Sequence, residues 1–243
     1  MKTKRLIVAN WKMNPLSLKE AVILARGSDE PRVVICPPFV FLDAVSKALV
    51  KAALGVQDVF WKAEGAYTGE VSPVQARRLG ALYAIIGHSE RRQNLYETDA
   101  MVGEKTIAAD RAGLIPILCV GETKNERDRG QAKAVVAREL DVTPKGLKRF
   151  IVAYEPLWAI STAKQARVDS SEDTLLMIKF IRERLRHKVQ SQNLQILYGG
   201  SVNSRDVEKF LPYEEIAGFL VGGASLRAGE FKKIIKKIQH YES

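Results

Sequence analysis

The stretch Phe150-Ile-Val-Ala-Tyr-Glu-Pro156 is an apolar run that ends in a carboxylate and a proline. Because a proline disfavours helical backbone in the residue before it, Glu155 is predicted to stand in extended backbone at the end of a buried strand. The residues that follow are small apart from Leu157, Trp158 and Ile160, and this composition predicts a mobile flap. The alternative is a turn that ends the strand and holds a solvated glutamate.

The same unit, a short apolar run followed by a longer amphipathic segment, recurs along the whole chain. The runs are rich in valine, isoleucine and leucine rather than strictly alternating, which is typical of parallel strands covered on both faces. We predict eight strands, at Arg5 to Ala9, Val33 to Cys36, Val56 to Phe60, Ala84 to Ile86, Ile115 to Val120, Phe150 to Tyr154, Gln195 to Tyr198, and Phe219 to Val221.

Helix signals lie between these runs. Ser17, with Glu20 three residues later, predicts a capping box at the start of the first helix. Ser72-Pro73 and Thr98 predict two further helix starts by the same logic. The last helix carries one apolar stripe opposite four lysines, which favours an outer helix of a barrel over a helix on a membrane surface. The residues of this stripe are Phe231, Ile234, Ile235 and Ile238.

The order of these elements predicts the fold class. Eight strand-then-helix units, without a linker, a low-complexity segment or a break in composition, indicate a single (β/α)8 barrel domain over residues 1–243. The chain has 243 residues, of which 46% are hydrophobic, and this is enough for one large core. A doubly wound open sheet is the alternative fold.

Charge and composition narrow the class of partner. The formal net charge is +10, but lysine and arginine are dispersed over helical faces rather than interleaved with aromatic residues. This pattern predicts a solvated basic surface that attracts small anions, and no nucleic-acid partner. No apolar run is long enough to span a bilayer or to form the core of a signal peptide, so we expect a cytoplasmic protein with no membrane partner. Cys36 and Cys119 have no paired spacing and predict neither zinc nor a disulfide.

Polar residues follow several of the predicted strands, at the end of the barrel where such folds carry their sites. The first strand runs into Asn10 and Lys12, the fourth into His88 and Glu90, and the sixth into Glu155. Taken singly, Lys12 fits a surface lysine, His88 a structural histidine and Glu90 an ion-pair partner. Together, at one end of a barrel, they predict a catalytic site.

Paired glycines follow the last two strands. Gly199-Gly200 and Gly222-Gly223 each expose backbone N–H groups and allow a ligand to approach closely. Either pair alone fits a tight turn. The two pairs together, after strands seven and eight, predict a phosphate site.

Several motifs, taken in order, resemble the triosephosphate isomerase family over the whole chain. Any one of them would be weak evidence, but their joint occurrence in this order is specific. They are Ala9 to Asn14, Ala63 to Pro73, Ile86 to Arg92, Leu118 to Glu122, Ala153 to Ala159, Tyr198 to Val202, and Val221 to Leu226.

This resemblance implies interconversion of dihydroxyacetone phosphate and D-glyceraldehyde 3-phosphate, in glycolysis and gluconeogenesis, without a cofactor or a metal. Glu155 is then the base that moves the proton, and His88 is the neutral electrophile, a pairing taken from the family's known mechanism. Lys12 supplies fixed positive charge and Asn10 a hydrogen-bond donor. Glu90 is expected to organise the polar network around Lys12.

The resemblance also implies a phosphate site, a lid and a homodimer. Phosphate is expected on Ser201, Gly222 and Gly223, with Ser161 contributing from the closed lid. Thr68, near the tip of a long third loop, is expected to reach the site of the partner subunit. The residues of the implied lid are Pro156, Leu157, Trp158, Ala159, Ile160, Ser161, Thr162, Ala163, Lys164, Gln165 and Ala166.

The chain departs from the family pattern at a few positions. Ser161-Thr162-Ala163 stands where the family's lid reads glycine-threonine-glycine, and Gln165 replaces a small residue at the trailing hinge. Asp58 stands where the base of the third loop has asparagine, and the segment from Asp141 to Gly146 is shorter than usual. The four catalytic positions are intact.

Two other functions fit parts of the pattern. Another phosphosugar enzyme on the same barrel would share the glycine pairs, but would have no reason to carry Asn10, Lys12, His88 and Glu155 together. A non-catalytic phosphate-binding or interaction protein would be expected to have lost one of these four residues.

Overall fold

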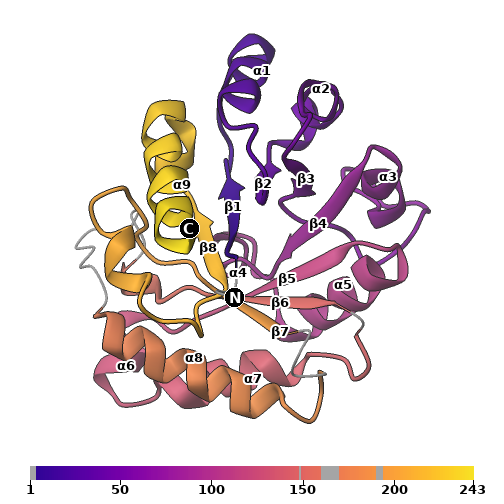
Figure 1. Cartoon of the computed structure of the whole chain (residues 1–243). Helices are drawn as coiled ribbons and strands as arrows, with labels where there is room; N and C mark the ends of the chain where they lie inside the picture. Colours follow the sequence, from indigo (N-terminus) through magenta and orange to yellow (C-terminus); the bar gives the residue numbers. More distant parts are fainter. Residues whose placement is uncertain (1–3, 148, 160–169, 190–193) are drawn as a thin grey trace.

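The computed structural model describes residues 4–147, 149–159, 170–189 and 194–243. Its strands form a closed barrel in which each strand lies parallel to the next, and β8 pairs with β1 to close the ring. Figure 1 shows the strands at the centre and the helices around them. The predicted (β/α)8 barrel is therefore confirmed, and an open sheet is excluded because its edge strands would be unpaired. The strands are β1 Leu6–Asn10, β2 Val33–Cys36, β3 Ala53–Val56, β4 Ala81–Ile86, β5 Ile115–Val120, β6 Phe150–Tyr154, β7 Leu194–Tyr198 and β8 Gly218–Val221.

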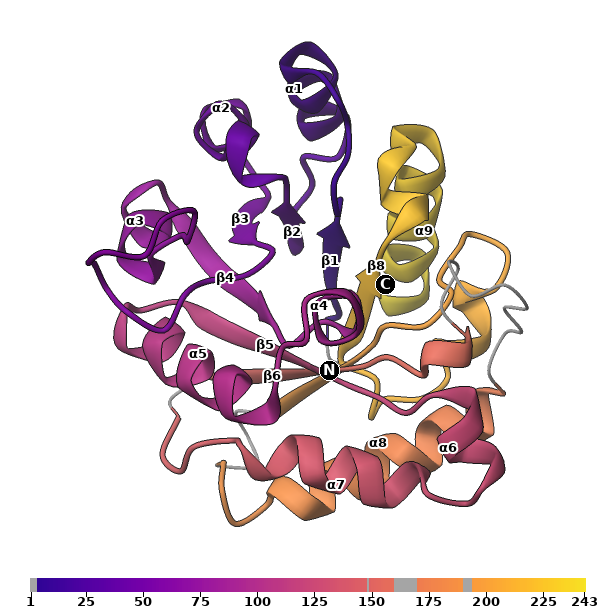
Figure 2. The ribbon, with the colours of Figure 1, turned by 180° about the vertical axis from the view of Figure 1, so that it is seen from behind.

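The longer helices pack outside the ring of strands, whereas the short helix α4 lies close to the barrel axis in both views (Figures 1 and 2). The α-helices are α1 Leu18–Gly27, α2 Leu42–Ala48, α3 Pro73–Arg78, α4 Ser89–Asn94, α5 Asp99–Arg111, α6 Lys124–Asp128, α7 Ala132–Asp141, α8 Ser171–Leu185 and α9 Ala228–Glu242. Short 3-10 turns are η1 Phe39–Phe41, η2 Leu157–Ala159, η4 Val207–Phe210 and η5 Gly223–Leu226.

The predicted helix starts are confirmed by their caps. The Ser17 hydroxyl accepts the N–H of Glu20 and donates to the Glu20 carboxylate at 2.9 Å, so that carboxylate does not reach the Ser17 backbone N–H and the predicted capping box is only half formed. Helix α1 ends at Gly27. The Ser72 hydroxyl accepts backbone N–H groups from the first turn of α3. The Gln75 side-chain oxygen in turn accepts the backbone N–H of Ser72, which completes a capping box. Thr98 caps α5 in the same manner. Local sequence therefore decides where these helices begin.

The C-terminal helix α9 covers the barrel next to α1 and η4. The side chains of its predicted stripe are all buried, which confirms an outer barrel helix. Among the residues that the structure describes, no helix is long and apolar enough to cross a membrane. The buried side chains of α9 are Phe231, Ile234, Ile235 and Ile238.

The core has two layers, as expected when both faces of a parallel sheet are covered. A larger layer lies between strands and helices, and a smaller layer fills the inside of the barrel. The inner layer includes both cysteines, which are free thiols and buried. Burial raises the pKa of the Cys36 and Cys119 thiols above the ordinary value.

The third strand was predicted wrongly, because it runs from Ala53 to Val56 and leaves the sheet where the prediction began. Gly55 lies inside the strand, where a Cβ would stand 2.6 Å from the Cys36 sulfur. A glycine in the interior of a strand weakens the sequence signal for that strand. Here the close approach of Cys36 requires a glycine. Val56 is followed by Gln57, whose side-chain amide turns back to the Cys36 carbonyl at 2.9 Å.

The other strands differ from their predictions only at their ends. β4 begins at Ala81, three residues before the predicted start, and Ala81 pairs with Leu54 of β3. β1 is displaced by one residue, whereas β7 and β8 each begin one residue early. Differences of this size are usual at strand ends, where pairing is incomplete.

Candidate active site

Asn10 and Lys12 stand at the carboxyl end of β1. The Asn10 side-chain oxygen accepts the backbone N–H of Lys12 at 3.1 Å. Lys12 has a φ of 53°, an uncommon left-handed conformation for a residue with a Cβ, and Gln57 holds its carbonyl at 2.7 Å. The Lys12 ammonium lies 2.5 Å from a Glu90 carboxylate oxygen. Backbone strain and an ion pair therefore fix one cation at the barrel mouth.

His88 caps the short helix α4 and faces Glu155. Its Nδ1 accepts the backbone N–H of Glu90 at 3.2 Å, so this nitrogen carries no proton in this arrangement. The other nitrogen, Nε2, lies 3.2 Å from Glu155 Oε1 and donates to it. The His88 side chain is only 8% exposed, and that of Glu155 3%, so the contact is shielded from water.

Two opposing effects act on the pKa of His88. Burial, the largest single effect, lowers it, whereas the charge of the Glu155 carboxylate, its hydrogen bond to the ring and the charge of Glu90 raise it, and the net direction is upward. The hydrogen bond from the Glu90 backbone to Nδ1 favours the neutral ring, because it occupies the lone pair that a second proton would need. The upward effect therefore depends on Glu155 itself and weakens when that carboxylate takes a proton.

Glu155 is placed by close backbone packing. Its N–H donates to the Val120 carbonyl at 2.8 Å, at the end of the neighbouring strand β5. Gly199 lies on the other side, where a Cβ would stand 2.7 Å from Glu155 Cγ. This is well inside the usual 3.5–4.0 Å contact between carbon atoms. Gly199 thus provides the space in which the Glu155 side chain lies.

The second glycine pair lies beside Lys12. A Cβ on Gly222 would stand 3.4 Å from Lys12 Cε, so the turn after β8 and the loop after β1 meet here. Gly223 begins the turn η5, and the first N–H groups of such a turn have no partner inside it. The buried Ser225 donates its N–H and hydroxyl to the Gly222 carbonyl. The start of a backbone turn and one cation therefore lie side by side, which is the composition that a phosphate site needs.

Ser201 differs from the other predicted phosphate residues. Its backbone N–H donates to the Ala159 carbonyl at 2.9 Å, so in this conformation it is directed at the chain. This bond ties the turn after β7 to the start of the predicted lid. The fourth predicted phosphate residue, Ser161, lies outside the described residues.

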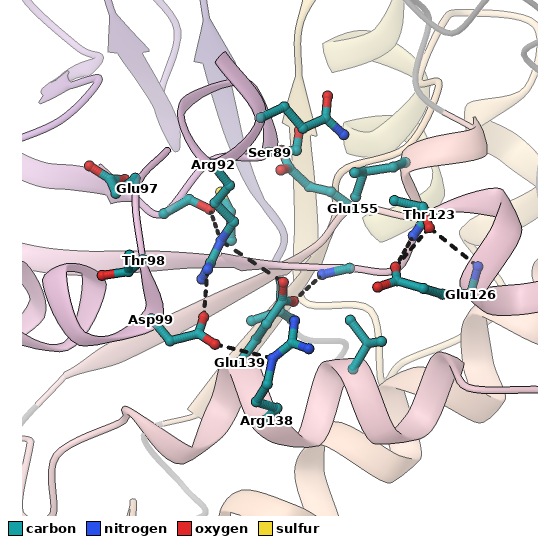
Figure 3. Close-up of a pocket in the computed structure, with 17 residues that line it drawn as sticks. Ser89, Arg92, Glu97, Thr98, Asp99, Thr123, Glu126, Arg138, Glu139 and Glu155 are labelled. Carbon is teal, nitrogen blue, oxygen red and sulfur yellow. Dashed lines mark hydrogen bonds and ion pairs between the residues drawn. The ribbon is translucent and has the colours of Figure 1, made fainter. Parts of the chain in front are cut away.

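Two cavities flank His88 and Glu155. One, of about 350 Å³, is lined by Asn10, Lys12 and His88 and by the loops after β2 and β3. The other, of about 390 Å³, extends from Glu155 and Ser89 towards α5 and α7 (Figure 3). Within the part of the chain that the structure describes, no group of three histidine, cysteine or acidic side chains is placed to hold a metal.

Comparison with known proteins identifies this arrangement. The family model described as triosephosphate isomerase matches residues 5–238. The chain belongs to the triosephosphate isomerase family. The triosephosphate isomerase of Dictyoglomus thermophilum is 42% identical over 246 residues, which cover 96% of this chain and 99% of the relative. Those of Acidithiobacillus ferrooxidans and Thermoanaerobacter pseudethanolicus are 43% and 38% identical, over 95% of this chain and 95% and 98% of the relatives.

The predicted lid is described only at its first residues. Pro156 follows Glu155, and Leu157 to Ala159 form the turn η2. The remaining predicted lid residues lie outside the described residues, and so do the two replaced glycine positions. These residues are Ile160, Ser161, Thr162, Ala163, Lys164, Gln165 and Ala166.

Glu122 anchors the start of this lid, although sequence analysis gave it no role. It is fully buried, and its carboxylate accepts from the Trp158 indole at 3.0 Å and from the Tyr154 hydroxyl at 3.1 Å. Arg127 pairs with the same carboxylate at 3.1 Å. Glu122 is the second residue after the end of β5, so the rule of reading polar residues after each strand could have found it.

Asp58 stands where the family pattern has asparagine, and the structure shows what surrounds its carboxylate. Its carboxylate lies 2.6 Å from the Lys105 ammonium and 2.9 Å from the Arg91 guanidinium, and Lys105 also binds Glu97. Burial raises the pKa of Asp58 to about 6, against the opposing effect of Lys105. Two cations therefore hold an acid where the family pattern has an amide.

The third loop, residues 61–71, projects from the barrel, and Thr68 near its tip is exposed. The loop is closed at its base, where the Phe60 N–H donates to the Val71 carbonyl at 2.8 Å. The Tyr67 ring packs on that of Phe60, with centroids 4.6 Å apart. The loop is thus ordered by its own contacts, while its tip contacts none of the predicted catalytic residues.

Proposed function

We propose that this enzyme interconverts dihydroxyacetone phosphate and D-glyceraldehyde 3-phosphate by proton transfer through an enediolate. Its family membership supports the reaction, and one observation carries the mechanism. That observation is the buried contact of 3.2 Å between His88 Nε2 and Glu155 Oε1, with Nδ1 already engaged by a backbone N–H. We expect the enzyme to act in the cytoplasm, in glycolysis and gluconeogenesis.

In this mechanism Glu155 takes the proton from the carbon next to the substrate carbonyl. The C–H electron pair becomes the carbon–carbon double bond of the enediolate, and the carbonyl pair moves to oxygen. His88 donates its Nε2–H to that oxygen, where negative charge develops. Glu155 then returns its proton to the former carbonyl carbon, and the hydroxyl on the other carbon gives its proton to the vacated His88 Nε2 as its oxygen becomes the new carbonyl. Both side chains regain their starting protonation, so that no redox partner, cofactor or metal is required.

The residues at β1 supply charge and orientation. The Lys12 ammonium favours an anionic substrate and the enediolate, and Asn10 supplies a donor at the same edge. Glu90 holds the ammonium at 2.5 Å and also lends its backbone N–H to His88. One residue therefore orients both of the groups that face the developing charge.

The substrate phosphate is expected on the backbone of Gly222 and Gly223, beside Lys12. Ser201 would join them once its N–H leaves the Ala159 carbonyl, and Ser161 would contribute from the closed lid. Exclusion of water by the lid matters because an enediolate phosphate can lose its phosphate group.

A coupled assay with each triose phosphate tests the reaction and the base together. Wild type is expected to convert both substrates, and Glu155→Gln to lose about a thousandfold in kcat because the general base is absent. Glu183→Gln, which changes a 68% exposed glutamate on α8, is the matched control and should retain wild-type rates. Wild type that converts neither substrate would refute the proposed reaction, and an active Glu155→Gln variant would refute the base.

We further propose that the enzyme is a homodimer joined through its third loop. Large apolar side chains are exposed on the loops after β1, β2 and β4, at the same end of the barrel as the site: Met13 by 86%, Val40 by 82% and Tyr96 by 83%. Exposed large apolar groups gathered at one end of the barrel favour an interaction surface. The cavity lined by Asn10, Lys12 and His88 also opens between these loops, where a partner's loop could enter.

Removal of Ala66 to Gly69 from the third loop tests this assembly. We expect monomers with little activity, because the shortened loop cannot reach a partner. Thr68→Ala, which keeps the loop length, is the control and should stay dimeric. Sedimentation measures the assembly, and a deletion variant that is dimeric and fully active would contradict the proposal.

A further inference from the structure

The cavity behind Glu155 ends at a second buried carboxylate, Glu139. Figure 3 shows Glu139 extending from α7 towards Arg92, with Glu155 and Ser89 on the far side of the cavity. Glu139 stands on the buried face of α7, among Val135, Val136 and Leu140. A carboxylate on an apolar helix face loses hydration, so its retention indicates a specific contact.

That contact is a hydrogen bond to the end of β5. Glu139 Oε2 accepts the backbone N–H of Gly121 at 2.8 Å, while its other oxygen lies 4.0 Å from Arg92 Nε. Burial raises the pKa of Glu139 to about 7, and Arg92 and the Gly121 N–H oppose this shift. The carboxyl group is therefore held mainly by one backbone donor.

The peptide group that Glu139 holds is the one that holds Glu155. Gly121 N–H and the Val120 carbonyl belong to one peptide unit and point in opposite directions because the unit is trans. The carbonyl accepts the N–H of Glu155 at 2.8 Å. One line of hydrogen bonds therefore runs from the Glu139 carboxyl, across a peptide, to the backbone of the base.

Gly121 also leaves little tolerance for movement. A Cβ at this position would stand 1.9 Å from the Glu155 carbonyl oxygen, so the two backbones are in direct contact. A tilt of the Val120–Gly121 peptide would therefore move the backbone from which the Glu155 side chain projects. Chains of hydrogen bonds also strengthen one another in a buried environment.

We infer that Glu139 is a positioning residue for the proposed base, acting on Glu155 through the Val120–Gly121 peptide. The inference rests on the proposed function, since it assigns Glu139 a place in that reaction. This positioning role depends on the length of the side chain rather than on its charge, because an acceptor oxygen must stand at the present distance from Gly121 N–H. A side chain that only anchors α7 to the barrel would depend on its charge and packing instead.

Two conservative variants separate reach from charge. Glu139→Gln keeps the length and an acceptor oxygen, and its kcat should stay within about threefold of wild type. Glu139→Asp keeps the charge but withdraws the oxygen by one methylene, and its kcat should fall about tenfold or more, because misplacement near 1 Å can cost a hundredfold. KM should change less than about twofold in both, because Glu139 lies away from the expected phosphate site.

Arg138→Leu is the matched control, because Arg138 lines the same cavity from the same helix but pairs only with Asp99 among the described residues, at 3.1 Å. Its kcat should equal that of wild type. If the Asp variant does not fold, Glu139→Met removes the acceptor at similar volume and should show the same fall in kcat.

The outcomes are distinct for the two proposals. A Gln variant that loses kcat while the Asp variant keeps it would overturn the positioning role, and so would equal kcat values in the two variants. A purely structural role would change KM, kcat and the melting temperature together, and would do so in Arg138→Leu as well. That result would also overturn the positioning role. Inactive wild type would refute the reaction and the inference together, whereas active wild type with unaffected variants would refute the inference alone.

Discussion

The two sides of the site depend on different parts of the chain. On the side of β1 and β4, side chains make the contacts: Lys12 pairs with Glu90, and His88 accepts a backbone N–H. On the side of β6 to β8, glycines shape the site because they have no side chain and leave room for a neighbour. Gly199 leaves room for Glu155, and Gly222 leaves room for Lys12. The first side should therefore be impaired by removing atoms, and the second by adding them.

Glu155 is the exception to this division, since it is a side chain on the side shaped by glycines, and it should give the largest effect. Glu155→Asp withdraws the carboxylate by about one methylene, which can cost roughly a hundredfold in kcat. Substrate affinity should change much less, and steady-state kinetics separate the two quantities. Near wild-type turnover in this variant would show that another group takes the proton.

Gly199→Ala tests the side shaped by glycines. The added Cβ would stand 2.7 Å from Glu155 Cγ, so the base must shift, and we expect kcat to fall roughly tenfold to a hundredfold. Gly229→Ala is the matched control, because a Cβ at Gly229 meets nothing within 4 Å. Equal kcat values for the two alanine variants would remove the distinction between the two sides.

Gly223→Val extends this test to the expected phosphate site. Bulk at a backbone donor should weaken inhibition by inorganic phosphate and by 2-phosphoglycolate together, by about tenfold or 1.4 kcal/mol for each inhibitor. Competition assays measure both constants. Unchanged inhibition by both compounds would place the phosphate elsewhere.

Asp58→Asn tests the side built from side chains, through stability rather than rate. Because burial raises the pKa of Asp58 from 3.8 to about 6, its ionisation costs stability. The contribution is full below pH 3.8 and is lost as the pH rises through 6. In wild type, the free energy of unfolding should therefore fall over this range by on the order of 1–3 kcal/mol relative to Asp58→Asn.

Denaturant unfolding between pH 4 and 8 measures this difference. Asp128→Asn serves as a control, since that side chain is 60% exposed. Its unfolding free energy should follow wild type at every pH. A constant offset between wild type and Asp58→Asn would contradict the expected pH dependence, whatever the sign of the offset.

Residues that directly follow strands could be placed from sequence. Closure of the barrel brings all strand ends to one rim, so reading the residue after each apolar run located Asn10, Lys12, His88 and Glu155 together. Their roles remain predictions. The glycine pairs were found by the same reading, because a turn that approaches a ligand closely requires glycine.

Residues that act through contacts distant in sequence could not be placed. Gly55 weakened the sequence signal of β3. A glycine is needed there because the Cys36 side chain on the neighbouring strand fills the space of a Cβ, and this contact cannot be read from the sequence. The space that Gly199 leaves for Glu155, and the bond from Glu139 to Gly121, exist only once neighbouring units pack. On α7 the Glu139 position even breaks the apolar pattern, so sequence alone offers no reason for its carboxylate.

The two cysteines inside the barrel provide an intrinsic probe of barrel opening. Cys36 and Cys119 both belong to the inner layer and are at most 1% exposed, and burial suppresses their ionisation. Alkylating reagents attack the thiolate, so Cys36 should not react while the strands remain paired, whereas Cys119 also lines the cavity beside Glu155. The rate of Cys36 alkylation in native buffer therefore reports how often the ring of strands opens. An added surface cysteine could then carry a spectroscopic label without a cysteine-free background.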